Sequence, residues 1–362
     1  MLRKCAATFA WIPRQQKHRF GGSVRHALAV FAVAIAATAI ADAHKFAEAP
    51  RAHDQQWFTA PSLPAPIAFA TATSTPDGRV WVIGGFDTDG NALSTVWAFS
   101  PQRGRWTAMP SMPTPRGAAQ AVATADKIYV IGGTPTEVGQ LSVVEVFDLR
   151  TGRWSGAPSM PTARFSMGAA IDERGRIHVV GGVSDNATFA LTDAVETFDT
   201  RTNQWSIGPS LPEPRALLVA GVGRRGQVYA IGGVNQAFDI IGNVDVLARG
   251  AVAWSPAAPL PHAVEDMGGA SAPDGRIYVV GGKDSFVTNK KTGDLQMLDP
   301  ETGKWTVLAP MPTPRCNPAV ALTQEGYLFA VAGEGQAPPN GVPPSLDTVE
   351  VHRTGSIEQR NR

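Results

Sequence analysis

The feature that most constrains this chain is a short apolar run that ends on two glycines and occurs six times in 362 residues. In one copy, residues 127–133, the doublet follows Lys-Ile-Tyr-Val-Ile. Successive first glycines lie 48, 49, 51, 49 and 51 residues apart, counting Ala332, which replaces the last of them. So regular a period predicts six copies of one structural unit, each packed chiefly against its neighbours. The doublets are Gly84-Gly85, Gly132-Gly133, Gly181-Gly182, Gly232-Gly233, Gly281-Gly282 and Ala332-Gly333.

Each unit contains four predicted strands. In the second unit the first strand follows the turn 112–116, and the glycine motif forms the second strand. The Val-Glu-Val-Phe-Asp segment 144–148 forms the third, and a fourth is centred on Trp154 after a Thr-Gly turn. Turn residues at fixed offsets between β-branched and aromatic runs predict an antiparallel meander. Because one such sheet cannot bury both faces alone, we predict an all-β fold, a six-bladed β-propeller of four-stranded antiparallel blades.

The two ends of the repeat array predict how the ring closes. Trp57 lies in a fourth-strand motif that no first three strands precede, whereas residues 348–351 form a third strand that no Trp follows. We therefore expect residues 54–64 and 313–353 to build the sixth blade together, which removes a free sheet edge. The predicted propeller spans residues 54–353, and residues 354–362 form a C-terminal tail.

The first 43 residues have the pattern of a secretory signal. A basic segment runs into the apolar block 27–41, and Ala41-Asp42-Ala43 follows as a cleavage pattern. The block has 15 residues, fewer than the roughly 20 that span a bilayer. We expect an exported protein, periplasmic or secreted, with residues 44–53 as a linker. The alternative is an inner-membrane protein anchored by residues 27–41.

Charge and cysteine content exclude some functions. Of 32 basic and 31 acidic residues, the predicted signal holds six and one, so the remainder carries 26 against 30, a net charge of −4. This balance argues against a nucleic-acid partner, which would require a basic face. Cys316 is the single cysteine outside residues 1–43, so we expect no disulfide within the mature chain. No spacing typical of a zinc or calcium site occurs, and we expect neither metal nor cofactor in a monomeric protein.

Glycine doublets, each followed by a Glu and then a Trp at a spacing of about 50 residues, resemble kelch repeats across residues 54–353. Trp97, Asp245 and Gln296 stand where this resemblance expects Glu. The resemblance, to kelch proteins of the exported bacterial type, implies a binding or interaction module. Its implied partner is a protein, a peptide or a small anionic ligand.

Four arginines occur where the loop from the preceding fourth strand enters an innermost strand, which predicts a ring at the channel mouth. In a kelch adaptor that recruits a stress-response transcription factor to a ubiquitin ligase, arginines at this motif position contact an acidic peptide. That resemblance implies that these four bind carboxylate or phosphate, which suit a planar two-pronged donor. The alternative is that they pair with backbone carbonyls and nearby carboxylates and tie blades together. The four are Arg116, Arg164, Arg215 and Arg315; blades one and five have Ile67 and Val264 instead.

Blade five places two acids, Glu265 and Asp266, beside the predicted arginine ring. With Arg215 they are weak candidates for a catalytic role, because a carboxylate near arginines can orient a polyol or act as a general base. Their simpler role is that of counter-charges. An enzyme resembling the exported sialic-acid mutarotases of this family is therefore the alternative function, but the uniformly short loops offer no water-excluding lid. We favour a binding module over an enzyme.

The remaining recurring residues are expected to serve the scaffold. The glutamates of the third strand should satisfy buried donors within each blade. The repeat tryptophans should pack between blades. These glutamates are Glu145, Glu196 and Glu350.

Overall fold

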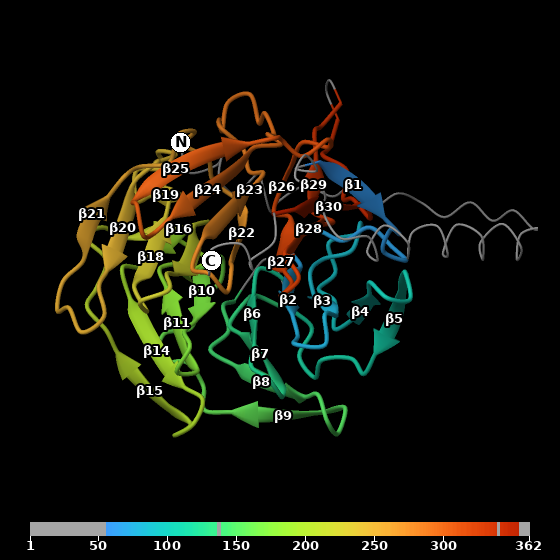
Figure 1. Cartoon of the computed structure of the whole chain (residues 1–362), viewed down its shortest axis with the longest axis horizontal. Coiled ribbons are helices and arrows are strands. Elements are labelled where there is room, and N and C mark those ends of the chain that lie inside the picture. Colours follow the sequence, from blue (N-terminus) through green and yellow to red (C-terminus); the bar gives the residue numbers. More distant parts are fainter. Residues whose placement is uncertain (1–55, 136–138, 339–340, 355–362) are drawn as a thin grey trace, which may run out of the picture.

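A computed structural model describes residues 56–135, 139–338 and 341–354, which form six four-stranded antiparallel sheets around a central axis (Figure 1). The predicted all-β, six-bladed propeller is confirmed, and the described residues contain no helix. It follows that nothing in the described part of the chain is a helix long and apolar enough to cross a membrane. The predicted signal, the linker and residues 355–362 of the predicted tail lie outside the described residues.

The two inner strands of each blade carry the apolar residues that the repeat places next to the axis. The innermost strands contact one another in a closed ring, which makes the wall of the channel. They are β2 (Thr71–Ser74), β6 (Gln120–Ala123), β10 (Gly168–Ile171), β17 (Val219–Val222), β22 (Gly268–Ser271) and β27 (Ala319–Leu322). The second strands are β3 (Val80–Ile83), β7 (Lys127–Ile131), β11 (Arg176–Val180), β18 (Val228–Ile231), β23 (Ile277–Val280) and β28 (Tyr327–Val331).

The two outer strands complete each sheet. The third strands are β4 (Val96–Ser100), β8 (Val144–Asp148), β14 (Val195–Asp199), β20 (Val244–Leu247), β24 (Leu295–Asp299) and β30 (Val349–Arg353). The fourth strands are β5 (Arg105–Met109), β9 (Arg153–Ala157), β15 (Gln204–Ile207), β21 (Ser255–Ala257), β25 (Lys304–Leu308) and β1 (Trp57–Ala60).

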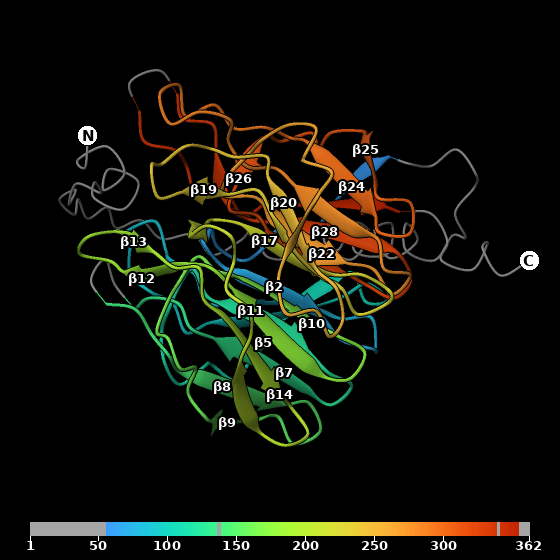
Figure 2. The same cartoon turned by 90° about the vertical axis from the view of Figure 1, so that its left-hand side faces the viewer.

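Short additional strands mark the face that we call the loop face, where the connections from second to third strand and from fourth to first strand lie. Figure 2 shows β12, β13, β19 and β26 towards one side of the propeller. Together with β16 and β29, these strands form three two-stranded sheets: β12 (Val183–Asp185) with β13 (Ala190–Leu191), β16 (Arg215–Ala216) with β19 (Val234–Asn235), and β26 (Arg315–Cys316) with β29 (Glu334–Gly335).

The two ends of the chain close the ring as the unmatched motifs predict. Strand β1 pairs with β30, from Trp57 opposite His352 to Ala60 opposite Val349. The sixth sheet therefore has the order β1-β30-β28-β27, and its outermost strand comes from the N-terminal end. This pairing removes the edge that β30 would otherwise leave open.

The repeat tryptophans join neighbouring blades at the outer rim. Each indole Nε1 donates a 2.8 Å hydrogen bond to a backbone carbonyl that follows the fourth strand of the preceding blade. Trp57 closes the circle by donating to Ala309. The predicted packing role of these tryptophans is confirmed. The bonds run from Trp57 to Ala309, Trp106 to Pro61, Trp154 to Pro110, Trp205 to Pro158, Trp254 to Pro209 and Trp305 to Ala258.

Among the described residues the core has seven apolar clusters: six lie one between each pair of adjacent blades, and the seventh joins Phe69, Phe86 and Phe165 with other loop-face residues around the mouth of the channel. Between blades one and two, for example, Trp81 contacts Phe147 with ring centroids 5.5 Å apart. Each sheet thus buries both faces only because it has a neighbour on each side. The array is stable as a closed ring, since an open end would expose one such cluster.

The glycine doublets join blades near the axis. The N–H of each second glycine donates to the backbone carbonyl of the residue at the arginine position in the next blade, from Gly85 to Arg116 (2.9 Å) around to Gly333 to Ile67 (3.1 Å). Both glycines of a doublet have positive φ, for example 61° at Gly132 and 96° at Gly133. A Cβ on Gly132 would lie 2.6 Å from the carbonyl oxygen of Arg164, so only glycine leaves room at this position of blade two.

We predict that Gly132→Ala destabilises the protein by about 2–3 kcal/mol, because it adds left-handed strain and a clash with backbone that cannot move aside. Urea unfolding would measure the loss as a lower transition midpoint. Ala332→Gly is the matched control, since Ala332 holds the equivalent position with φ 57°. Its unfolding free energy should stay within about 1 kcal/mol of wild type. Equal losses in the two variants would contradict this account of the doublet.

Candidate binding site at the channel mouth

The four predicted arginines lie inside the blades, with 0–1% of each residue exposed. Each guanidinium contacts a carboxylate on the third strand of its own blade. Arg116 Nη2 lies 2.5 Å from Glu145 Oε2, and Arg215 contacts Asp245 in the same way. The other two pairs are Arg164 with Glu196 at 3.0 Å and Arg315 with Glu350 at 2.8 Å.

Backbone carbonyls accept further hydrogen bonds from these arginines. Arg116 Nη1 donates to the carbonyls of Gly132 (3.3 Å) and Val143 (3.2 Å), at the end of β7 and the start of β8. Arg315 Nη1 reaches the equivalent carbonyls, Ala332 (3.0 Å) and Thr348 (3.1 Å). Each side chain thus ties the entry loop to the second and third strands of one blade.

The placement of the arginines does not support the prediction that they bind an anion. None of the four belongs to the residues that line the described cavities of the channel. It matches the alternative, in which they pair with carbonyls and carboxylates. The side chains, however, tie parts of a single blade, and the backbone carbonyls of the same residues join that blade to the preceding one. Burial lowers the pKa of Arg116, and Glu145 opposes this shift, so the side chain remains cationic at neutral pH.

The sequence contained a signal for this pairing that inspection of single motifs misses. The two blades without the arginine are also the two without an acid at the third-strand position: Ile67 occurs with Trp97, and Val264 with Gln296. Asp245 replaces the expected Glu but keeps the charge opposite Arg215. The recurring glutamates satisfy buried donors as expected, since Glu145 also accepts from the Thr114 hydroxyl at 2.6 Å.

We predict that Arg116→Val costs about 3–5 kcal/mol of unfolding free energy, because it leaves Glu145 buried without a partner charge. The double variant Arg116→Val/Glu145→Gln copies the Val264–Gln296 pair of blade five and should recover at least half of that loss. Denaturant unfolding of both single variants and the double variant gives the coupling free energy. Additive losses would show that the pair does not act as a unit.

Six residues with left-handed backbone, one from each blade, form what we call the neck of the channel. Their φ values lie between 50° and 57°. Five backbone hydrogen bonds of 2.6 to 3.3 Å link them in order around the axis, each from the N–H of one to the carbonyl of the preceding one. Their spacing is therefore fixed by backbone, whatever side chain each carries. The neck residues are Phe69, Ala118, Ser166, Leu217, Asp266 and Asn317.

A cavity of about 120 Å³ lies at the neck. Its wall consists of the neck residues and the small residues that begin the innermost strands, such as Ala70 and Gly168. Phe69, Ala118 and Leu217 are the apolar neck residues in this lining, and Ser166, Asp266 and Asn317 are the polar ones. Among the described residues that line this cavity, Asp266 is the single ionisable one.

The polarity of the mouth changes between blades four and five. In every blade the residue after the arginine position forms an antiparallel bridge with the residue after the glycine doublet. In blades one to four these bridges are uncharged: Ala68–Phe86, Gly117–Thr134, Phe165–Val183 and Ala216–Val234. In blades five and six the bridges are Glu265–Lys283 and Cys316–Glu334.

The charged side of the mouth is a compact cluster of buried groups. Lys283 Nζ lies 2.8 Å from Glu265 Oε1 and 3.4 Å from Asp266 Oδ2, so one ammonium serves two carboxylates. Lys291 Nζ lies 3.8 Å from Glu334 Oε2. The structure thus brings the candidates Glu265 and Asp266 together, but Arg215 pairs with Asp245 in blade four instead of joining them.

Burial controls protonation in this cluster. It raises the pKa of Asp266 to about 7, with a further contribution from Glu334. It raises the pKa of Cys316 to about 12, so the side chain is a neutral thiol 3.6 Å from Glu334 Oε2. Cys316 is fully buried. No group of three metal-ligating His, Cys, Asp or Glu side chains occurs in the described parts of the chain.

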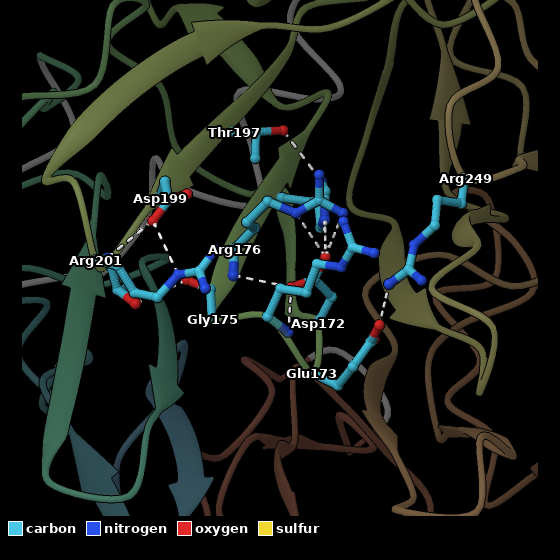
Figure 3. A network of polar contacts seen from close by, with 11 residues as sticks. Asp172, Glu173, Gly175, Arg176, Thr197, Asp199, Arg201 and Arg249 are labelled. Carbon is cyan, nitrogen blue, oxygen red and sulfur yellow. Dashed lines mark hydrogen bonds and ion pairs between the residues drawn. The ribbon is translucent and has the colours of Figure 1, made fainter.

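The opposite end of the channel holds a larger cavity of about 490 Å³. Its acids are occupied by neighbouring arginines (Figure 3): Asp172 contacts Arg176 at 2.7 Å, and Glu173 pairs with Arg249 of the next blade. These contacts hold turns and join blades three and four. We therefore place the candidate site at the neck, where Asp266 is the single ionisable residue among the described residues that line the cavity.

Comparison with known proteins agrees with the repeat architecture. The model of the KLHDC2/KLHL20/DRC7 Kelch-repeats domain matches residues 70–258, and that of the Kelch motif matches residues 267–312. The chain belongs to the kelch-repeat family. Members of this family typically are protein-interaction modules.

Similar proteins support the same assignment. Kelch-like protein 35 of Mus musculus is 28% identical over 72% of this chain and 42% of its own length. Beta-scruin of Limulus polyphemus is 32% identical over 36% of this chain and 14% of its own length. The chain thus spans less than half the length of these relatives. The solved structure of YjhT has a TM-score of 0.65 at 18% identity, covers 81% of this chain and 99% of that one, and shares the fold.

Proposed function

We propose that this protein is a binding module whose partner docks on the loop face and places a small group into the cavity at the neck. Three things support the proposal: membership of the kelch-repeat family, the cavity, and the two-sided mouth. The proposed setting, the periplasm or the medium, rests on the sequence pattern of residues 1–43, which lie outside the described residues.

The proposal rests on a difference in charge between the equivalent antiparallel bridges of the six blades. Blades one to four form the bridge after the arginine position with uncharged residues, so the scaffold does not require charge there. Burying carboxylates and ammonium groups is costly unless they are paired. Blades five and six nevertheless carry Glu265, Lys283 and Glu334 at these positions. A binding role explains why the chain keeps these buried charges despite their cost in free energy.

The partner first expected was an anionic ligand or acidic peptide held by the arginines. The described geometry favours a different chemistry, because the four arginines are buried and ion-paired within the blades, and Asp266 is the single ionisable residue in the described lining of the cavity. The loop face also offers aromatic contact area. Phe189 and Phe238, both half-buried, lie with ring centroids 5.7 Å apart on the loops of blades three and four.

Capture of partners from an extract of the cells that natively produce the protein tests the proposal. Phe189→Ala/Phe238→Ala should lower recovery of a partner at least about tenfold, since buried aromatic contacts dominate protein interfaces. Ile207→Ser is the control, because Ile207 is 82% exposed on the outer strand β15. Capture that all three proteins support equally, or none above background, would contradict the proposal.

A second candidate function, a sugar-active enzyme of mutarotase type, is favoured by one observation. Asp266 is among the residues that line the cavity, and burial raises its pKa to about 7, which suits a group that gives and takes protons near neutral pH. NMR exchange between the anomers of sialic acid should then be faster with wild-type protein and unaccelerated with Asp266→Asn. Exchange at the uncatalysed rate with wild type would leave the binding module as the assignment.

A further inference from the structure

We propose that His352 is an acid-sensitive switch on the strand that closes the ring: its protonation releases β1 from β30 and opens the joint between blades five and six. The inference goes beyond the proposed binding function and does not depend on it. It starts from an exception in the repeat, at the third-strand position that lies opposite the fourth-strand tryptophan.

Four other blades place an apolar side chain at this position. In blade six the residue is His352, opposite Trp57. An ionisable side chain thus replaces an apolar one in the blade that the two ends of the repeat array build together. The four apolar pairs are Phe99–Trp106, Phe147–Trp154, Phe198–Trp205 and Leu298–Trp305.

His352 is buried as an apolar residue would be. The residue is 0% exposed, and neither ring nitrogen has a hydrogen-bond partner in the described part of the chain. Its ring packs against that of Trp57 with centroids 5.3 Å apart, much as Phe147 packs against Trp154 at 5.1 Å. Protonation would add a buried charge and a second unpaired N–H donor, so this packing accepts the neutral imidazole alone.

The titratable and charged groups on the elements around His352 do not offer it a counter-charge. Strand β1 carries none. On β30, Glu350 is ion-paired with Arg315. Burial is accordingly the whole cause that lowers the pKa of His352, to about 4. The other groups on these elements are Tyr327 and Arg353 in blade six and Asp274, Arg276, Tyr278, Asp299 and Lys304 in blade five.

Strand β1 is the element that opening would release. It lies at the edge of its sheet and pairs with β30 alone, over four residues. In the other five blades a short turn joins the fourth strand to the third, whereas β1 and β30 lie far apart in the sequence. Strand β1 can therefore leave β30 without unfolding the other three strands of blade six.

Opening and protonation are linked through the surroundings of His352. When β1 leaves, the imidazole loses the Trp57 ring and meets water, where a histidine has a pKa of about 6.5. The closed form keeps its full advantage above pH 6.5 and loses it progressively as the pH falls towards 4. Between pH 7.5 and pH 5 the opening equilibrium should rise about 30-fold. A contact between the imidazolium and the Trp57 ring would offset only part of the cost of an unpaired buried cation.

Native-state hydrogen exchange of the full chain at pH 7.5 and pH 5 tests the switch. After correction for the intrinsic exchange rate, protection of the β1 amides should fall about 30-fold at the lower pH. Strand β25 is the internal control, because its Trp305 lies opposite Leu298, and its protection should change less than about threefold. Unchanged protection of β1 would overturn the proposal. An equal fall in both strands would also overturn it, because the whole protein would then be opening.

His352→Phe is the decisive variant, since three blades carry Phe at this position. It should reduce the change in β1 protection between the two pH values to less than about threefold. His352→Leu copies blade five and gives the same readout should the Phe variant not fold.

His178→Tyr is the matched control for loss of a buried histidine. His178 is 7% exposed but contacts Thr197 and Asp172, and three other blades hold Tyr at its position. This variant should keep the 30-fold change in β1 protection. A pH response that survives in the His352 variants, or that His178→Tyr abolishes, would overturn the assignment of the switch to His352.

Discussion

The fold depends on backbone hydrogen bonds that cross from blade to blade. Near the axis, the second glycine of each doublet donates to the carbonyl at the arginine position of the next blade, and at the rim a tryptophan indole donates to the blade before it. Because each sheet needs a neighbour on both faces, no joint can be lost without exposing an apolar cluster. Glycine and tryptophan therefore recur as joints, and their recurrence carries no information about a ligand.

The buried arginines support these joints from within single blades. Arg116 holds the loop whose carbonyl accepts from Gly85, and it does so by bonding Gly132, Val143 and Glu145 within its own blade. Burying an ion pair gains little net stability over an apolar pair of similar shape. This explains how Ile67 with Trp97, and Val264 with Gln296, replace it in two blades of the same ring.

The sequence predicted the architecture well because the same pattern of strands and turns recurs six times. Blade number, strand order and closure by Trp57 all follow from period and turn residues. The site was less predictable because the arginine motif fixes position along the chain but not whether a side chain points into the channel or into the blade. The neck carried no recognisable pattern, since its six positions share a left-handed backbone and hold Phe, Ala, Ser, Leu, Asp and Asn.

In a repeat protein, a feature that serves the scaffold recurs, whereas a feature that serves one ligand breaks the symmetry. The four arginines recur together with four acids, as scaffold parts do. Asp266 does the opposite: it stands at a position that holds Phe, Ala, Ser or Leu in four other blades, and it is buried beside the Glu265–Lys283 ion pair. A pure scaffold has no reason to keep such a group, because an apolar residue would avoid the cost of burying it. That asymmetry is why the site belongs between blades five and six.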